Sequence, residues 1–439
     1  MTLKTRRTIF YFLVLLFVIA ATLVIFYSMG FRIDFKNFAV TETGGIYVRS
    51  NPSDIGIVLD GKQIKNRSGI LNSGTLIDDL SPGIYALNID FDGYASWQKD
   101  VRVLPGIVSV FDSIVLISND GREKLMDAVH EFRFANGLLV TRTQDTIEFD
   151  GAQITGNEII DFTDGGNVIT QDIASENYYL SNISDLESSL NLTTMFNNLK
   201  EIRLDLPGAV SIVKIAPYPF DDSRFVVMTA RALYVLNTDD SEIEQIGEQT
   251  DDFFVANDEV FWVNDEGLWS YGLVLGNKSL IDNSFTKSDD IRKVDASDDR
   301  LIVLRGSGVL SYIDRDSLNT TTTYVTARYF SFSPNRQLLM FEGTNGAITV
   351  YDFEEEEDGK QLIPLVDLSG ASVDKVAWYE DNAHIFVKDS SGSLKFIEID
   401  NSTPINEVLI SGDVNDFTYD NDTDSLYYGN DSGVWRLEI

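Results

Sequence analysis

The residue pattern with the most evident chemistry is a short acidic stretch near the end of the chain. Asp420, Asp422 and Asp424 occupy positions 1, 3 and 5 of a possible calcium loop, and carboxylates at this spacing suit Ca²⁺. Position 6 is Ser425 instead of glycine, and position 12 is Asp431 instead of glutamate. A solvated turn between two strands explains the same residues. Calcium is therefore the only candidate cofactor, with a plain turn as the alternative.

Two aromatic residues form a second candidate site. Tyr94 and Trp97 follow the Asp92-Gly93 turn signal, and a pair of exposed aromatic rings can stack on a carbohydrate. Aromatic residues after a glycine turn also fill the core of a small domain. The pair is thus a candidate binding site or part of a sandwich edge.

Other catalytic groups are scarce. The chain has no cysteine, which excludes disulfides, thiolate metal sites and cysteine nucleophiles. The chain has only two histidines, His130 and His384. They leave almost nothing for a zinc site or a Ser-His-Asp triad. Carboxylates for glycoside hydrolysis are abundant, but no motif singles out a pair. We therefore predict no catalytic residues and no enzymatic activity, with a hydrolase of envelope polysaccharide as the rival interpretation.

The charge is strongly acidic and unevenly distributed. The 439 residues include 34 Lys and Arg and 69 Asp and Glu, a formal net charge of −35. Residues 1–39 hold five basic and one acidic residue, and residues 40–118 hold six and nine. The remaining 23 basic and 59 acidic residues give −36 for residues 119–439. Such a surface repels phosphate backbones, so nucleic acid is excluded as a partner. The run Glu354–Asp358 predicts a loop between strands, or a docking point for a basic partner.

The N-terminal region contains an apolar segment long enough to cross a membrane. Residues 9–27 carry no charge and would span about 28 Å as a helix. Lys4, Arg6 and Arg7 precede the segment, which places the N-terminus in the cytoplasm and the rest of the chain outside. A cleaved signal peptide and a buried core helix are the alternatives. The lipid bilayer is therefore a predicted partner through residues 9–29.

Strand and turn signals then alternate over residues 44–117. Apolar runs near residues 46–48, 55–59, 84–91 and 107–117 are separated by turns such as Asp60-Gly61, Pro82-Gly83 and Pro105-Gly106. Strands at this spacing, without a helical period, predict a small antiparallel β-sandwich.

This region resembles the PEGA domain. The matching positions are Gly45, Ser50, Pro52, Gly56, Val58, Asp60, Gly61, Pro82, Gly83, Tyr85, Gly93, Tyr94, Trp97, Val101, Val103, Pro105 and Gly106. The tetrad that names the family is degenerate here, because residues 52–56 read PSDIG. The resemblance implies a β-sandwich of prokaryotic envelope proteins, often beside a transmembrane segment, and it brings no catalytic residue.

The rest of the chain repeats with a period near 40 residues. Copies of a strand, polar turn, strand, turn and strand pattern start near residues 130, 159, 210, 251, 291, 327, 373 and 414. This period predicts a β-propeller of seven or eight blades, since one small sheet cannot bury both of its faces alone. The last copy ends on a third strand, so an outer strand from residues near 112–128 is expected to complete it. The stretch SFSPNRQLLMF also resembles the turns of WD40-like and TolB-like propellers.

The predicted fold class is all-β after one transmembrane helix. The predicted segments are a cytoplasmic N-terminus (1–8), an anchor (9–29), a linker (30–43), a PEGA-like sandwich (44–117) and a propeller (119–439). We expect a single-pass protein of the prokaryotic cell membrane whose extracytoplasmic propeller binds an envelope protein or a glycan. A purely structural envelope component is a further alternative.

Overall fold

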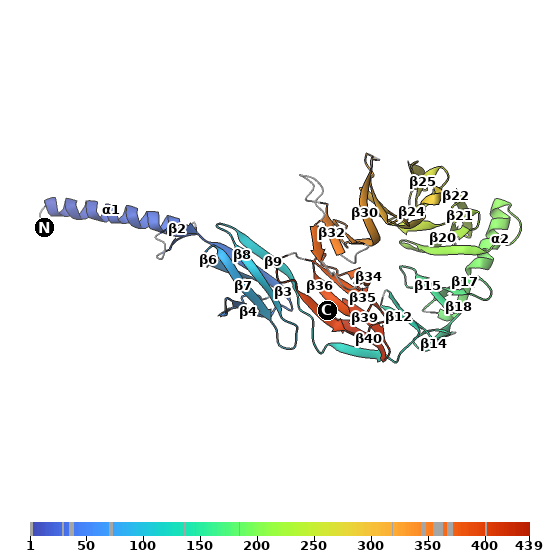
Figure 1. Cartoon of the computed structure of the whole chain (residues 1–439), viewed down its shortest axis with the longest axis horizontal. Helices are drawn as coiled ribbons and strands as arrows, with labels where there is room; N and C mark the ends of the chain where they lie inside the picture. The colour runs from blue at the N-terminus through green and yellow to red at the C-terminus, as the bar shows by residue number, and fades with distance from the viewer. Residues whose placement is uncertain are drawn as a thin grey trace. The chain divides into compact units, whose positions relative to one another are not determined.

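Figure 1 shows the computed structural model of the chain. The structure describes residues 3–28, 30–34, 39–69, 73–135, 137–144, 146–183, 185–317, 319–343, 348–353, 363–366, 372–399 and 402–439. Two compact units are present. The first contains the described residues up to Gly121 together with residues 402–408, and the second contains Arg122–Ile399 and Leu409–Glu438.

The chain begins with a long apolar helix, α1 (Leu3–Ser28), which Figure 1 labels at the N-terminus. It is the one helix in the described part of the chain that is long and apolar enough to cross a membrane. The large apolar side chains that are described, from Ile9 to Ile19 and at Val24 and Ile25, are exposed. The hydroxyl of Thr22 donates to the carbonyl oxygen of Val18 at 2.9 Å, so this polar group is satisfied within the helix. The helix therefore has the composition of a membrane anchor or of a signal sequence.

A hairpin and a β-sandwich follow. The hairpin pairs β1 (Phe31–Asp34) with β2 (Ala39–Glu42). One sandwich sheet has the order β6-β3-β9 and comprises β3 (Gly44–Asn51), β6 (Thr75–Leu80) and β9 (Val108–Val115). The other has the order β5-β4-β7-β8 and comprises β4 (Gly56–Leu59), β5 (Lys62–Ile64), β7 (Gly83–Asp90) and β8 (Trp97–Val103).

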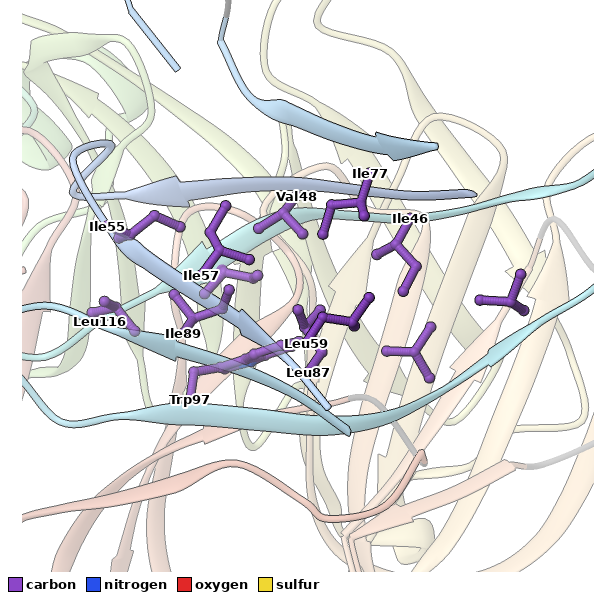
Figure 2. Close-up of a cluster of buried hydrophobic side chains, with 13 residues drawn as sticks. Ile46, Val48, Ile55, Ile57, Leu59, Ile77, Leu87, Ile89, Trp97 and Leu116 are labelled. Atoms are coloured by element: carbon purple, nitrogen blue, oxygen red, sulfur yellow. The ribbon is translucent and has the colours of Figure 1, made fainter. Parts of the chain in front are cut away.

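The sandwich core is continuous between the two sheets. Figure 2 shows side chains from both sheets pointing toward one another, among them Ile46, Ile57, Leu87 and Trp97. Alternate residues of each strand point inward, as the burial of β8 shows with buried and exposed positions in strict succession. Burying one such large side chain contributes roughly 1.5–3 kcal/mol. The predicted sandwich is therefore confirmed.

The sandwich differs from the prediction in one pairing. β3 and β9 run parallel, with Tyr47 opposite Val110, whereas an entirely antiparallel arrangement was expected. The last strand returns beside the first one in the same direction, and this pairing leaves no local signal because the two strands are far apart in the sequence. The polar strands β5 and β6 also lacked the apolar runs that the prediction used.

Eight four-stranded sheets follow in the described residues. Sheet 1 is β11 (Glu131–Ala135), β12 (Leu138–Arg142), β13 (Ile147–Phe149) and β14 (Ala152–Ile154). Sheet 2 is β15 (Glu158–Phe162), β16 (Val168–Asp172), β17 (Asn177–Asn182) and β18 (Asp185–Asn191). Sheet 3 is β19 (Ile212–Tyr218), β20 (Asp221–Thr229), β21 (Ala232–Asn237) and β22 (Glu242–Glu248). Sheet 4 is β23 (Phe253–Ala256), β24 (Glu259–Asn264), β25 (Gly267–Gly272) and β26 (Lys278–Asp282), followed by the short 3-10 helix η1 (Lys287–Asp289).

The long strand β30 (Asn319–Phe332) joins sheets 5 and 6, because its first half pairs with β29 and its second half with β31. Sheet 5 is β27 (Ile291–Ala296), β28 (Arg300–Arg305), β29 (Val309–Asp314) and β30. Sheet 6 is β30, β31 (Leu338–Gly343), β32 (Ile348–Asp352) and β33 (Ile363–Val366). Sheet 7 is β34 (Val373–Trp378), β35 (His384–Asp389), β36 (Leu394–Glu398) and β37 (Glu407–Ser411).

The eighth sheet combines the two ends of the repeat region. It consists of β38 (Asp416–Asp420), β39 (Ser425–Asn430), β40 (Gly433–Glu438) and β10 (Arg122–Met126), which pairs antiparallel with β40. The outer strand expected from residues near 112–128 is thus β10. First strands of neighbouring sheets, such as β23 and β27 or β11 and β38, contact one another. The predicted propeller is confirmed, and it has eight blades.

Three lysines connect first strands across sheet boundaries in a regular pattern. They occupy the third position of β19, β27 and β34: Lys214, Lys293 and Lys375. Each ammonium donates to the carbonyl oxygen of a phenylalanine in the next sheet, at 2.8, 2.8 and 2.7 Å: Phe253, Phe330 and Phe417. The same ammonium groups lie 4.8 to 5.2 Å from the centres of those three rings, close enough for a cation–π interaction. The same lysine contact therefore joins sheet 3 to sheet 4, sheet 5 to sheet 6, and sheet 7 to sheet 8.

A second helix, α2 (Leu192–Leu204), follows sheet 2 and was not predicted. Asn191 caps its N-terminus by accepting a hydrogen bond from the backbone N–H of Thr194 at 2.8 Å. Leu192, Phe196 and Leu199 recur at helical spacing and are buried against sheets 2 and 3. The repeat that spans residues 159–209 is therefore longer than the others because it contains this helix after the last strand of its blade.

Residues 402–406 lie against β8 in the first unit. The backbone N–H of Asp100 donates to the carbonyl oxygen of Thr403 at 3.0 Å. Gln98 exchanges two hydrogen bonds with the Asn406 side chain, at 3.0 and 3.1 Å. The buried ammonium of Lys99 donates to the carbonyl oxygen of Ser402 at 3.1 Å. Residues 402–408 thus belong to the first unit together with the sandwich strands.

Candidate functional site

The structure does not bring the three carboxylates of the predicted calcium loop together. Asp420 is buried and accepts hydrogen bonds from the backbone N–H and the hydroxyl of Thr423, at 3.2 and 2.5 Å. Asp424 has a left-handed backbone with φ of 44°, and Asp422 is exposed in the same turn. Within the described residues no group of three or more such side chains is arranged to hold a metal ion. Calcium binding by this loop stays a prediction.

Asp424 instead connects sheets 7 and 8. It accepts hydrogen bonds from the hydroxyls of Tyr419 and Tyr379, at 3.0 and 3.4 Å. Burial, followed by the neighbouring Asp424 carboxylate, raises the pKa of both phenols well above the usual value. Both therefore remain protonated donors, and the acidic turn is part of an inter-sheet hydrogen-bond network.

The predicted stacking pair is not a surface site. Trp97 is 2% exposed, and its ring packs edge-to-face against Phe111 with centroids 5.5 Å apart. Tyr94 is partly buried and packs edge-to-face against Phe91 at 5.0 Å. A sugar ring cannot reach the indole without opening the sandwich. The Trp97 assignment is therefore corrected to a core role, because alternation along β8 turns this position inward.

Three further sequence candidates remain: the two histidines and the acidic run. Among the described residues neither histidine is part of a group that could hold a metal ion, and the acidic run lies outside these residues. His384 is buried, with Nδ1 2.6 Å from a carboxylate oxygen of Asp381 and its ring stacked on Phe396. His130 is exposed and its backbone N–H donates to Arg142. The acidic run Glu354–Asp358 lies outside the described residues.

A cleft beside sheets 3 and 4 gathers groups that the sequence did not single out. It has a volume of about 290 Å³, and its lining includes Arg203, Tyr218, Arg224, Glu242, Glu244 and Tyr271. Arg203 lies in the last turn of α2, while Tyr218 and Arg224 flank the turn between β19 and β20. The other three come from β22 and β25. With Val235 and Asn237 of β21, six elements contribute to one cleft, which explains why no contiguous motif predicted it.

The cleft groups are oriented by hydrogen bonds and ring contacts. The guanidinium of Arg224 lies 5.5 Å from the centre of the Tyr218 ring, and its Nε is 3.1 Å from a carboxylate oxygen of Asp221. The hydroxyl of Tyr271 donates to Glu244 at 2.8 Å, and that of Tyr218 donates to the carbonyl oxygen of Leu273. Burial raises the pKa of both tyrosines, and for Tyr271 the bond to Glu244 adds to the rise. The buried, neutral phenols thus form the floor of the cleft, and the guanidinium and carboxylate groups around them are more exposed.

A buried carboxylate in sheet 6 has weak compensation. Glu342 is 6% exposed, and its Oε1 has no hydrogen-bond partner among the described residues. The nearest cation is the partly exposed Arg328, whose Nη1 lies 4.0 Å from Oε1. Burial, with a smaller contribution from the Asp374 carboxylate, raises the pKa of Glu342 above its usual value.

The substitution Glu342→Gln is expected to stabilise the propeller by roughly 1 kcal/mol at pH 7, because it removes an uncompensated buried charge. A carboxylate whose pKa is raised by folding destabilises the native state above that folded pKa, and the cost disappears as the pH falls toward the unfolded value. The gain should therefore vanish near pH 4. Urea unfolding at pH 7 and pH 4 measures it, with the exposed Glu123→Gln as control. Equal gains at both pH values would refute the charge explanation.

Comparisons with known proteins found similar solved structures but no similar sequence. No family model matches the chain, and no curated protein matches its sequence. The similar solved structures include the computationally designed Ika8 protein, with a TM-score of 0.49 and 13% identity over 72% of this chain and 98% of that one. BamB from Moraxella catarrhalis has a TM-score of 0.47 and 13% identity over 73% and 99%. The C-terminal WD40 domain of Sif2 has a TM-score of 0.46 and 10% identity over 72% and 98%. The PEGA resemblance gains no support from these comparisons, and the propeller assignment comes from the eight sheets.

Proposed function

We propose that this protein is a membrane-anchored, non-enzymatic binding protein of a prokaryotic cell envelope, and that its propeller holds a partner protein in the cleft beside sheets 3 and 4. Helix α1 supports the anchor, because its length and uncharged centre suit a bilayer. Lys4, Arg6 and Arg7 before the apolar centre favour a cytoplasmic N-terminus. The sandwich and propeller would then lie outside the cytoplasm.

The single observation that carries the binding proposal is the composition of the cleft. Protein interfaces are enriched in tyrosine and arginine, which dominate the binding energy at their centres. Tyr218 and Tyr271 are each 6% exposed and hydrogen-bonded, so they form the fixed floor of the cleft. The groups that a partner can reach are the more exposed side chains of Arg203, Glu242 and Glu244. Arg224 already stacks on Tyr218. These features suit a peptide segment of mixed charge, and they set this cleft apart from the net acidic character of residues 119–439.

Photo-crosslinking in intact cells tests this function. A photoreactive residue at position 242, on the cleft wall, is expected to give one discrete protein adduct, whereas the same residue at the exposed position 123 of β10 should not. Arg224→Ala should reduce the adduct at position 242 by about tenfold, the loss expected for one interface anchor. Thermal unfolding of the variant checks that the fold is retained. A glycan adduct would replace the protein partner by a glycan, and equal adducts at both positions would refute the cleft as the site.

A further inference from the structure

One end of the β-sandwich carries a concentration of exposed apolar side chains. The Pro105-Gly106 turn joins β8 to β9, and beside it Leu104 and Ile107 are 44% and 51% exposed. Ile84, which pairs with Arg102 on the neighbouring strand, is 70% exposed. Single exposed apolar residues are ordinary, but a contiguous group of large ones usually indicates an interaction surface.

The same apolar character continues over the outer face of one sheet. Tyr47 pairs with Leu76 on one side and with Val110 on the other, so the three residues form a row across β6, β3 and β9. Leu76, Val108 and Val110 are all exposed. Neighbouring positions in β3, such as Ile46, point into the core instead. The apolar end is defined as Leu104 and Ile107 of the loop, Leu76, Val108 and Val110 of this face, and Ile84, which is exposed on the other sheet.

Hydrogen bonds attach the apolar end to the chain where it leaves α1. The helix ends at Ser28, and the carbonyl oxygen of Gly30 accepts bonds from the backbone N–H and the hydroxyl of Thr43, at 2.9 and 2.8 Å. The carbonyl oxygen of Thr43 in turn accepts a bond from the N–H of Gly106 at 3.1 Å. Only Thr43 thus separates the exposed loop from the first residues after the helix.

The backbone at the start of β3 is in close contact with the loop between β8 and β9. The N–H of Gly45 donates to the carbonyl oxygen of Ile107 at 3.0 Å. A Cβ atom at Gly44 would be only 2.3 Å from the carbonyl oxygen of Leu104, so glycine permits this close approach. Gly106 has φ of 68°, which suits the second central position of a Pro-Gly turn. The loop is therefore attached to the start of β3 by close backbone contacts on both sides of its Pro-Gly turn.

We propose that the apolar end inserts into the interfacial layer of the same bilayer that α1 crosses, and so forms a second membrane contact that holds the sandwich against the membrane. This inference rests on the proposed anchor function of α1. Gly30 must lie at the membrane surface if α1 spans the bilayer, and the loop is tied to Gly30 through Thr43. Apolar side chains near the acyl boundary are stabilised by leaving water. Glu42, whose carboxylate lies beside Gly106, limits the insertion to the side-chain tips.

The opposite end of the sandwich consists of polar turns. Strand β3 runs from Gly44 to Asn51, about 23 Å at the usual rise per residue. Beyond it lie the exposed residues Ser53 and Asp54, and the Asp92-Gly93 turn is on the same side because Asp90 pairs with Gly56. Carboxylates favour water over a lipid interface. The apolar end also carries the exposed carboxylates Asp78 and Asp79 on β6, just before Leu80, which pairs with Gly44. The two ends therefore differ in their exposed apolar side chains, and the carboxylates confine the insertion to the loop between β8 and β9.

Single-cysteine labelling tests the inference cleanly, because the natural chain has no cysteine. The full-length variants Ile107→Cys, Ser53→Cys and Phe17→Cys are labelled with an environment-sensitive fluorophore. They are then reconstituted into vesicles of phosphatidylethanolamine and phosphatidylglycerol, with or without lipids that carry a quenching doxyl group. We expect doxyl lipids to quench the probe at position 107 at least about twice as strongly as the probe at position 53, with a blue-shifted emission at position 107 only.

The Phe17→Cys probe separates the two hypotheses. Quenching at position 17 by a deep doxyl group, without quenching at position 107, would overturn the second contact and leave the anchor intact. No quenching at position 17 would overturn the anchor itself. A blue shift at position 107 that persists in detergent and grows with protein concentration would point to a second copy of the chain on this surface, and it would also overturn the inference. Reduced quenching of a Leu104→Cys probe in an Ile107→Asp background would support the shared insertion of the loop.

Discussion

Replacing Gly433 by valine is expected to lower the free energy of unfolding of the propeller by about 3 kcal/mol or more. Gly433 has φ of 152°, a conformation that residues with a side chain rarely adopt. A Cβ atom there would lie 2.3 Å from the carbonyl oxygen of Met126 and 2.5 Å from Cε of Lys124. Both neighbours belong to β10, so the added side chain would push apart the pairing of β10 with β40.

The location of this pairing explains the size of the effect. β10 precedes the first sheet in the chain and completes the last one, so loss of the pair opens the ring where its two ends meet. Urea unfolding followed by tryptophan fluorescence is a suitable measurement, since four of the five tryptophans lie in the propeller and only Trp97 lies in the sandwich. Gly412→Ala is the matched control, because a Cβ there meets no atom within 4 Å. A Gly433→Val variant as stable as this control would show that the closure contributes little.

Replacing Trp97 by alanine is expected to destabilise the sandwich by about 3–5 kcal/mol, the usual cost of removing a buried aromatic ring. The indole is surrounded by both sheets and contacts Phe111. Trp97→Phe should recover much of this loss, because it retains an apolar ring in the same space. Thermal unfolding of the full chain, with limited proteolysis to identify the sandwich, measures the effect.

Tyr94→Ala provides the comparison for that substitution. Tyr94 is only partly buried, so its removal should cost clearly less than the removal of Trp97. If Trp97→Ala left the stability unchanged but abolished binding of a glycan, the indole would be a ligand contact after all, and the core assignment would be wrong.

The regular part of this fold could be predicted because its signals are local. Each blade repeats an apolar strand, a polar turn and a second apolar strand, and the observed first strands begin within two residues of seven of the eight expected starts. At the remaining start, near residue 327, β30 is already extended from Asn319 and exchanges partners at that position. The expected outer strand was also found, because an unfinished final repeat leaves an unpaired edge that some other segment must cover.

The elements that were missed have signals of another kind. Helix α2 forms because Asn191 caps it and its apolar residues Leu192, Phe196 and Leu199 fall on one face. This pattern is too short to be recognised among so many strands. The parallel pairing of β3 with β9 depends on strands more than 50 residues apart in the sequence. Trp97 was assigned to a possible surface pair because its type alone does not say which face of β8 it occupies.

Local sequence patterns predicted the apolar helix, the succession of strands and turns, a repeat of seven or eight units and the position of the acidic charge in residues 119–439. Only the tertiary structure decided which side chains meet. It put the calcium candidates Asp420 and Asp424 into separate hydrogen bonds, turned Trp97 inward, and assembled the Arg224 and Tyr271 cleft from six elements. The physical reason is that strand and turn propensities act between near neighbours in the chain, whereas a site depends on packing that brings distant residues together.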